Sequence, residues 1–270
     1  MARHERAKRV GADGGPVRRS WARRIVLAFV AVPLGLLVGS VAGVFGQSYH
    51  WRTAPRHSIG IAPDPATTPE AVVQVYVARA FAWRSAFGVH SWIAVKPTGA
   101  SRFTVYEVIG WHVMHGGSAL SRSHRPPDGL WYGNRPEIIA EARGDGVDAL
   151  IERIEAAAEA YPFPDDYTVW PGPNSNTFTA YIARLVPELR VDLPPTAIGK
   201  DYLTDGVIAR APSGTGWQVS LFGLAGVLLA AEEGFEINLL GLTFGFDWKD
   251  PALKLPGIGR IDLFGKRDPA

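Results

Sequence analysis

Three residues of this chain, His90, His112 and Ser175, are the ones best suited to catalysis. Both histidines fall in stretches typical of neighbouring strands, and Ser175 opens a stretch with helical spacing. A serine at a helix start lies near unpaired backbone N–H groups and the positive end of the helix dipole, which can stabilise an oxyanion. A serine hydroxyl is not ionised at neutral pH, so it needs a base, usually a histidine held by a second polar group. The strand register decides whether the two histidines share a face.

Each of these residues also has a purely structural interpretation. Asn174 or Ser175 can cap the helix, as these residue types often do. His90, beside Trp92, can be a half-buried histidine bonded to a backbone carbonyl.

A metal site is a further alternative for the histidines, because His112 and His115 are close in sequence and His124 follows. Residues three apart on a strand point to opposite faces, so we predict no metal and no cofactor.

Next to Ser175, the chain has residues that can bind a substrate. The aromatic residues of 161–170 can line a cleft or, as a proline-bracketed loop, pack on the core. We predict substrate contacts for Trp170, Asn174 and Asn176.

Four stretches of the sequence resemble the membrane-associated bacterial family known as domain of unknown function 3750. They are HSWIAVK, GWHV, YPFPDDYTVWPGPNSNTF and LPGIGRI, and the resemblance runs from about residue 71 to 263. The order of strand histidine first and helix-start nucleophile later is, more distantly, similar to the circularly permuted papain-like superfamily. That superfamily includes lecithin–retinol acyltransferases and permuted relatives of the NlpC cell-wall peptidases.

The papain-like resemblance implies roles for the three residues. His90 matches the base, His112 the orienting group, and Ser175 stands where that superfamily has its catalytic cysteine. Serine in place of the thiol is a departure from the pattern.

The fold class predicted from these patterns is α+β, an antiparallel sheet with packed helices, permuted papain-like by resemblance. Strands are predicted at 71–78, 89–96 and 103–113, the last two joined by a turn at 97–99. The segment 128–143 is ambiguous. Helices are predicted from Asp145 to about Tyr161 and over 175–189. Two apolar runs, 221–231 and 235–246, predict a long hairpin within 217–248 that turns at Glu232-Glu233-Gly234.

The N-terminal part of the sequence predicts a membrane anchor. Residues 25–45 contain no charged residue and are long enough to cross a hydrocarbon core of roughly 30 Å. Eight basic residues precede them, which by the positive-inside rule keeps the N-terminus cytoplasmic. We therefore predict a basic tail at 1–24, a transmembrane helix at 25–46, a linker at 47–68 and an extracytoplasmic domain at 69–270. A cleaved export signal is the alternative, with a twin-arginine-like Arg18-Arg19.

Charge and composition narrow the function. The chain carries a formal net charge of +2, but the basic tail accounts for the excess, which argues against a nucleic-acid partner. The absence of cysteine excludes disulfides and a thiolate nucleophile. We expect a single-pass protein of the bacterial inner membrane whose partners are the bilayer and a cell-wall peptide or lipid substrate. Two functions remain open, a Ser/His hydrolase or acyl-transfer enzyme and a catalytically inactive binding or structural module of the envelope.

Overall fold

The computed structural model describes residues 50–264. Their secondary structure is mixed, with two antiparallel sheets and few helices, which agrees with the predicted α+β class. Among these residues no helix is long and apolar enough to cross a bilayer. The predicted tail and transmembrane segment lie outside the described residues.

The first sheet has five strands in the order β4-β3-β2-β1-β5. They are β1 (Val72–Arg79), β2 (Val89–Lys96), β3 (Thr104–Val108), β4 (Leu120–Ser123) and β5 (Pro136–Arg143). A short 3-10 helix, η1 (Ala82–Ala86), joins β1 to β2, and α2 (Gly110–Met114) joins β3 to β4. The valine-rich composition of β1 and β2 suits strands that are covered on both faces.

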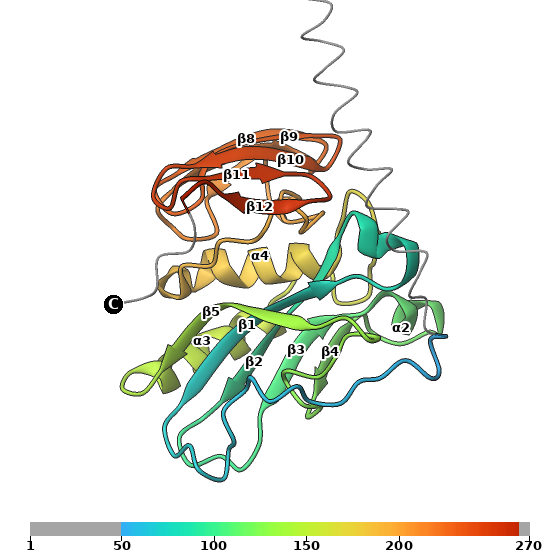
Figure 1. Cartoon of the computed structure of the whole chain (residues 1–270), viewed down its shortest axis with the longest axis vertical. Helices are drawn as coiled ribbons and strands as arrows, with labels where there is room; N and C mark the ends of the chain where they lie inside the picture. The colour runs from blue at the N-terminus through green and yellow to red at the C-terminus, as the bar shows by residue number, and fades with distance from the viewer. Residues whose placement is uncertain (1–49, 265–270) are drawn as a thin grey trace, which may run out of the picture.

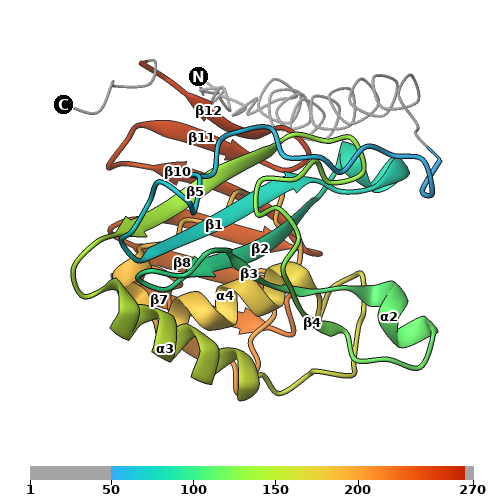
Figure 2. The ribbon, with the colours of Figure 1, turned by 90° about the horizontal axis from the view of Figure 1, so that it is seen from below.

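Two helices cover one face of this sheet, α3 (Val147–Glu159) and α4 (Ser175–Leu185), as Figure 2 shows. Alternate strand residues such as Val75, Ile93 and Val95 form the main core with Ile154 and Phe178 of these helices. A 3-10 turn, η2 (Pro187–Leu189), follows α4, so the helix predicted over 175–189 ends earlier than expected.

The other face of the sheet carries a second apolar cluster. It contains Tyr76, Trp92 and Trp131, with Ala54 and Ile61 from the segment that we expected as a linker. This segment is held by the carboxylate of Asp128, which accepts hydrogen bonds from Ser58 and from the backbone of Ile61 and Ala62. The described part of the expected linker therefore lies against the domain.

The second sheet is a seven-stranded meander in which every strand pairs with its neighbour in sequence. Its strands are β6 (Ile208–Arg210), β7 (Gly216–Leu221), β8 (Ala225–Ala230), β9 (Gly234–Leu239), β10 (Leu242–Asp247), β11 (Ala252–Leu255) and β12 (Gly259–Asp262). The turn before Gly234 joins β8 to β9 as expected, but that hairpin is part of this larger sheet. Figure 1 shows α4 between the two sheets.

Candidate functional site

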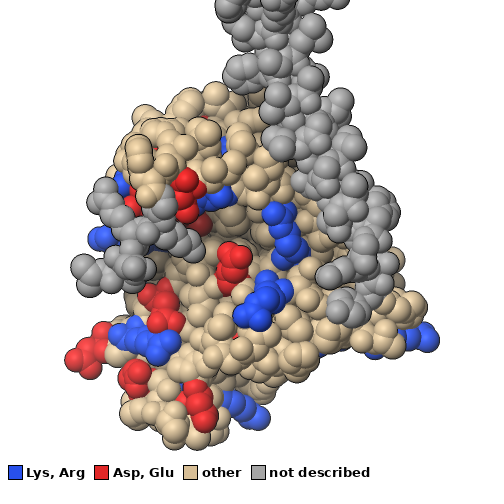
Figure 3. Space-filling model, in the orientation of Figure 1, with Lys and Arg blue, Asp and Glu red and all other residues tan. Residues whose placement is uncertain are grey.

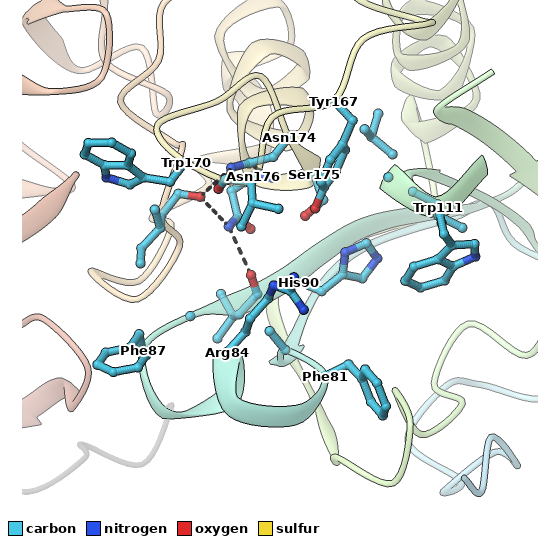
Figure 4. Close-up of a pocket in the computed structure, with 18 of the residues that line it drawn as sticks. Phe81, Arg84, Phe87, His90, Trp111, Tyr167, Trp170, Asn174, Ser175 and Asn176 are labelled. Atoms are coloured by element: carbon cyan, nitrogen blue, oxygen red, sulfur yellow. Dashed lines mark hydrogen bonds between the residues drawn. The ribbon is translucent and has the colours of Figure 1, made fainter. Parts of the chain in front are cut away.

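The candidate site is a cavity of about 630 Å³ at the start of β2 and the start of α4. His90 and Ser175 both line it, together with Trp111, Trp131 and Tyr167. Figure 4 shows His90 on β2 and Ser175 on the helix side of this cavity. Its walls are mostly apolar, and Arg84 is the single lysine or arginine among the lining residues.

Asn176 fixes the start of α4 against β2. Its side-chain amide donates to the backbone oxygens of Val89 (3.0 Å) and Ile198 (2.8 Å), and its Oδ1 accepts from Ser91 (2.9 Å). Val89 and Ser91 flank His90, so these bonds bring Ser175 to the start of β2, where His90 lies.

Asn174 is the N-cap of α4 and forms a capping box with Thr177. Its Oδ1 accepts from the backbone N–H groups of Asn176 and Thr177, and its Nδ2 donates to Val169 and Ile198. The side-chain donors of Asn174 and Asn176 are thus fully used within the protein. We therefore assign to both residues the positioning of the helix start; substrate contact through these amides stays a prediction.

His90 lies on the face of the sheet opposite to α4, because its neighbour Ser91 is the residue that faces the helix. Its ring stacks on Trp131, with the centroids 3.8 Å apart, and is only 6% exposed. His90 is the second residue of β2, so its ring still borders the cavity, which lies at the start of this strand. Within residues 50–264, no hydrogen bond joins His90 to Ser175.

The carboxylate of Glu107 on β3 binds the Nε2 atom of the His90 ring. Its Oε2 lies 2.9 Å from His90 Nε2, and its two oxygens bind the guanidinium of Arg125 at 2.8 and 3.1 Å. Arg125 in turn lies over the ring of Trp92. Glu107 is 1% exposed, and burial alone would raise the pKa of its carboxyl. The bonds from His90 and Arg125 outweigh burial and lower this pKa to about 2.

The tautomer of His90 follows from this partner. An ionised carboxylate only accepts hydrogen bonds, so His90 Nε2 carries the proton and Nδ1 keeps its lone pair. Burial lowers the pKa of His90 from its usual 6.5, against the hydrogen bond to Glu107, which raises it. At neutral pH the imidazole is therefore neutral and Nδ1 is a base.

His112 is not where the sequence predicted it. The strand that we expected over 103–113 ends at Val108, and His112 lies in α2. The lining of the cavity includes Trp111 and Val113 but not His112. Glu107 takes the contact with His90 that was expected of His112, which corrects the predicted orienting group. The backbone N–H of Ile109 still bonds to Ala119, in register with β3 and β4, and the chain turns into α2 directly after it.

Trp170 lines the cavity, and its indole N–H donates to the backbone oxygen of Leu240 at 2.9 Å; its contact with a substrate stays a prediction. Tyr167, one of the aromatic residues of 161–170 but not singled out from the sequence, also lines the cavity. Burial raises the pKa of its hydroxyl, so it is a donor at neutral pH. Its ring packs directly on Gly110, where a Cβ would lie 2.4 Å from the ring.

Residues 70–202 match the family model described as "Protein of unknown function (DUF3750)". The chain belongs to this family. No curated protein and no solved structure matches the chain. The DUF3750 match contains His90, Glu107, Arg125 and Ser175 and ends before β6, so the seven-stranded sheet and the LPGIGRI stretch lie beyond it.

Proposed function

We propose that the DUF3750 domain is a serine hydrolase or acyltransferase that acts on an ester or amide of an apolar group. The observation that carries the proposal is that Ser175 and a neutral His90, held by Glu107, line one apolar cavity. Catalytic hydrogen bonds are often long without substrate and tighten when it binds. Direct contact between Ser175 and His90 is therefore expected in the substrate complex.

The reaction follows from these groups. Ser175 Oγ attacks the carbonyl carbon while its proton passes to His90 Nδ1. The bond from that carbon to the alcohol or amine breaks, and the leaving group takes the proton from His90. Water, or an acceptor alcohol or amine, then attacks the acyl-Ser175 ester and restores the hydroxyl. Glu107 stabilises the imidazolium that forms in each half of the reaction.

Two hydrogen-bond donors, the backbone N–H of Ser175 and the hydroxyl of Tyr167, are suited to stabilising the oxyanion of the intermediate. The backbone N–H groups of Asn176 and Thr177 are taken by Asn174, but no described residue accepts from the N–H of Ser175. This group stands at the positive end of α4. Tyr167, whose hydroxyl is protonated, lines the same cavity and is the second donor.

The lining favours a lipid over a cell-wall peptide as substrate. Phe81, Trp83, Phe87, Met114 and Leu242 contribute large apolar surfaces, which suit an acyl chain. Arg84 is suited to a phosphate or carboxylate headgroup (Figure 4).

A permuted papain-like fold is part of the proposal. It is supported by a histidine on one strand, an acid on the next, and a nucleophile at the start of a helix that packs on the histidine strand. We also propose that residues 25–46 anchor the chain in the inner membrane, with the domain outside the cytoplasm, on the basis of the uncharged segment and the preceding arginines.

Labelling with a fluorophosphonate probe tests the nucleophile. The wild-type chain is expected to label at Ser175, and Ser175→Ala and His90→Ala are both expected to lose labelling, because one removes the oxygen and the other the base. Ser121→Ala, on β4, is the control and should label as wild type. Peptide mapping by mass spectrometry identifies the modified residue. Labelling retained in Ser175→Ala would refute the proposed nucleophile.

The pH dependence of labelling tests the base. His90 acts as a base only when it is neutral, and burial lowers its pKa below 6.5. The labelling rate should therefore be level at neutral pH and fall when the pH drops below the pKa of His90. In Glu107→Gln the carboxylate that raises the pKa of His90 is gone, so the acid limb should move to lower pH. An unchanged limb in this variant would contradict the role of Glu107.

A binding module for an apolar ligand is the second candidate. The lack of a direct Ser175–His90 hydrogen bond in the described structure favours it. In that case the cavity binds a fatty acid, and Ser175→Ala binds it as well as wild type while no variant labels.

A further inference from the structure

In a water-soluble protein the apolar face of a sheet is usually buried and its polar face exposed. The seven-stranded sheet has the opposite arrangement. Cross-strand partners share a face, so the register of β7–β12 defines rows of side chains. The outward rows are Trp217–Leu229–Phe235–Phe246–Leu253–Ile261, Val219–Val227–Ile237–Phe244 and Leu221–Ala225–Leu239–Leu242. We call these residues the apolar grid; none of them is charged or carries a strong hydrogen-bonding group except the indole of Trp217.

The inward face of the same sheet carries many polar side chains that are bound to partners, beside a small apolar cluster that includes Leu228 and Ala230. Its Glu236 pairs with Lys200 and Lys254, while Gln218 and Asn238 donate to Asp201. These groups are buried against the segment that follows α4. The sheet cannot turn its apolar side inward without breaking this network, so the apolar grid stays outside.

Most residues of the apolar grid are exposed to solvent in the part of the chain that the structure describes. Trp217, Leu229 and Leu239 are 55–57% exposed. Two hairpin tips extend the surface, because Phe222 and Leu240 are exposed and adopt positive φ values of 53° and 54°. Glycine or asparagine is usual at positions of positive φ, and the two side chains that stand there instead expose large apolar surfaces, 69% for Phe222 and 67% for Leu240.

We infer that the apolar grid lies on the hydrocarbon of a lipid bilayer. Protein interfaces mix apolar side chains with polar and hydrogen-bonding ones, even at their centre. Three successive rows without a charge suit a partner that offers no hydrogen bonds, which is lipid. In Figure 3 the surface over β8 and β9 is almost free of charged side chains. The uncharged segment 25–45 of the same chain, the proposed anchor, ends just before the described residues and keeps the domain beside a bilayer.

The cavity borders this surface. Leu242 belongs to both the apolar grid and the cavity lining, and Trp170 of the lining bonds to the backbone of Leu240. A lipid in the bilayer would therefore meet the cavity at the edge of the sheet. The docking itself does not depend on the proposed catalysis.

The absence of cysteine makes the test direct, because one introduced cysteine is unique. The full chain is reconstituted in vesicles of phosphatidylethanolamine and phosphatidylglycerol with a fluorescent label at Val227→Cys or, as control, at Glu152→Cys on α3. The label at 227 should be quenched by brominated acyl chains and should be roughly tenfold less accessible to aqueous iodide than the label at 152, because hydrocarbon excludes ions. Equal iodide access at both sites would overturn the inference. Protection from iodide without bromolipid quenching, with cross-links between the cysteines of two chains, would show instead that a second copy covers the grid.

A charged variant gives an independent check. Leu229→Asp with Ile237→Asp places two carboxylates beside residue 227 and should return that label to full iodide access while the chain stays in the vesicles. Thermal unfolding in detergent verifies that the variant is folded; if it is not, the comparison of labels 227 and 152 in the unmutated grid decides. A folded variant whose label stays protected would overturn the inference.

Discussion

Replacing Glu107 by alanine is expected to lower the free energy of unfolding by about 3–5 kcal/mol, because it leaves the buried imidazole of His90 and the partly buried guanidinium of Arg125 without the carboxylate that binds both. Glu107 is the shared partner of His90 and Arg125, and its side chain is 2% exposed. Its pKa is lowered to about 2 in the folded protein, from 4.5. A lowered pKa stabilises the fold above the unfolded value, so this contribution is complete above about pH 4.5 and is lost as the pH falls towards 2.

Urea unfolding at pH 7, followed by circular dichroism, measures the change. Glu188→Ala is the control, because its ion pair with Arg153 is exposed and should be worth no more than about 1 kcal/mol. If Glu107→Ala loses no more stability than this control, then Glu107 does not hold the His90 ring in the way described. Wild type should also lose stability below pH 4.5 more steeply than Glu107→Ala.

The second large effect is expected for Glu236→Ala, again about 3–5 kcal/mol. Glu236 bridges two buried lysines, Lys200 of the segment after α4 and Lys254 of β11. Without it each ammonium keeps a single carboxylate, Asp201 or Asp192. The bridge joins the second sheet to the rest of the domain, so the variant should release that sheet first.

Limited proteolysis separates this local loss from general unfolding. Cleavage between residues 203 and 216 should become faster in Glu236→Ala than in wild type, with residues 70–202 still protected. Glu232→Ala, in the turn before β9, is the matched control, because its partners Lys249 and Arg190 are both exposed, and it should be cut at the wild-type rate. Simultaneous digestion of both parts in Glu236→Ala would contradict the bridging role.

The strands around the candidate site were predictable because their composition is unambiguous. The predicted strand 89–96 coincides with β2, and 71–78 differs from β1 by one residue at each end. The start of α4 at Ser175 was also predictable, from helical spacing after an asparagine cap. Local patterns were sufficient for the position of β1 and β2 and for the start of α4.

The orienting residue was not predictable, since it depends on where β3 ends. Composition carries an apolar pattern through Val113, whereas the chain turns after Ile109 into α2. The signal that could have found Glu107 is an acid in the middle of a strand expected to be buried, because such a carboxylate needs a partner. The pairing Ile93↔Tyr106 then places Glu107 near His90, and register is a property of the folded sheet.

The seven strands of the second sheet were not predictable from the sequence, for another reason. In β8 the sequence AGVLLA has small residues where other sheets have polar ones, so it reads as one apolar run. The turns carry Phe222 and Leu240, which do not signal turns by composition. The alternation in β7, β9 and β10 indicates the strand period.

The pairing of the meander has a consequence for how the chain folds. All seven strands pair with sequence neighbours, so their ladders close short loops and should form early and fast. On the inner side of this sheet, Glu236 and Lys254 pair with each other within the meander, but their further partners, Lys200 and Asp192, come from residues 187–205. Folding should therefore end with a docking step whose rate responds to ionic strength, because it joins opposite charges across two preformed units.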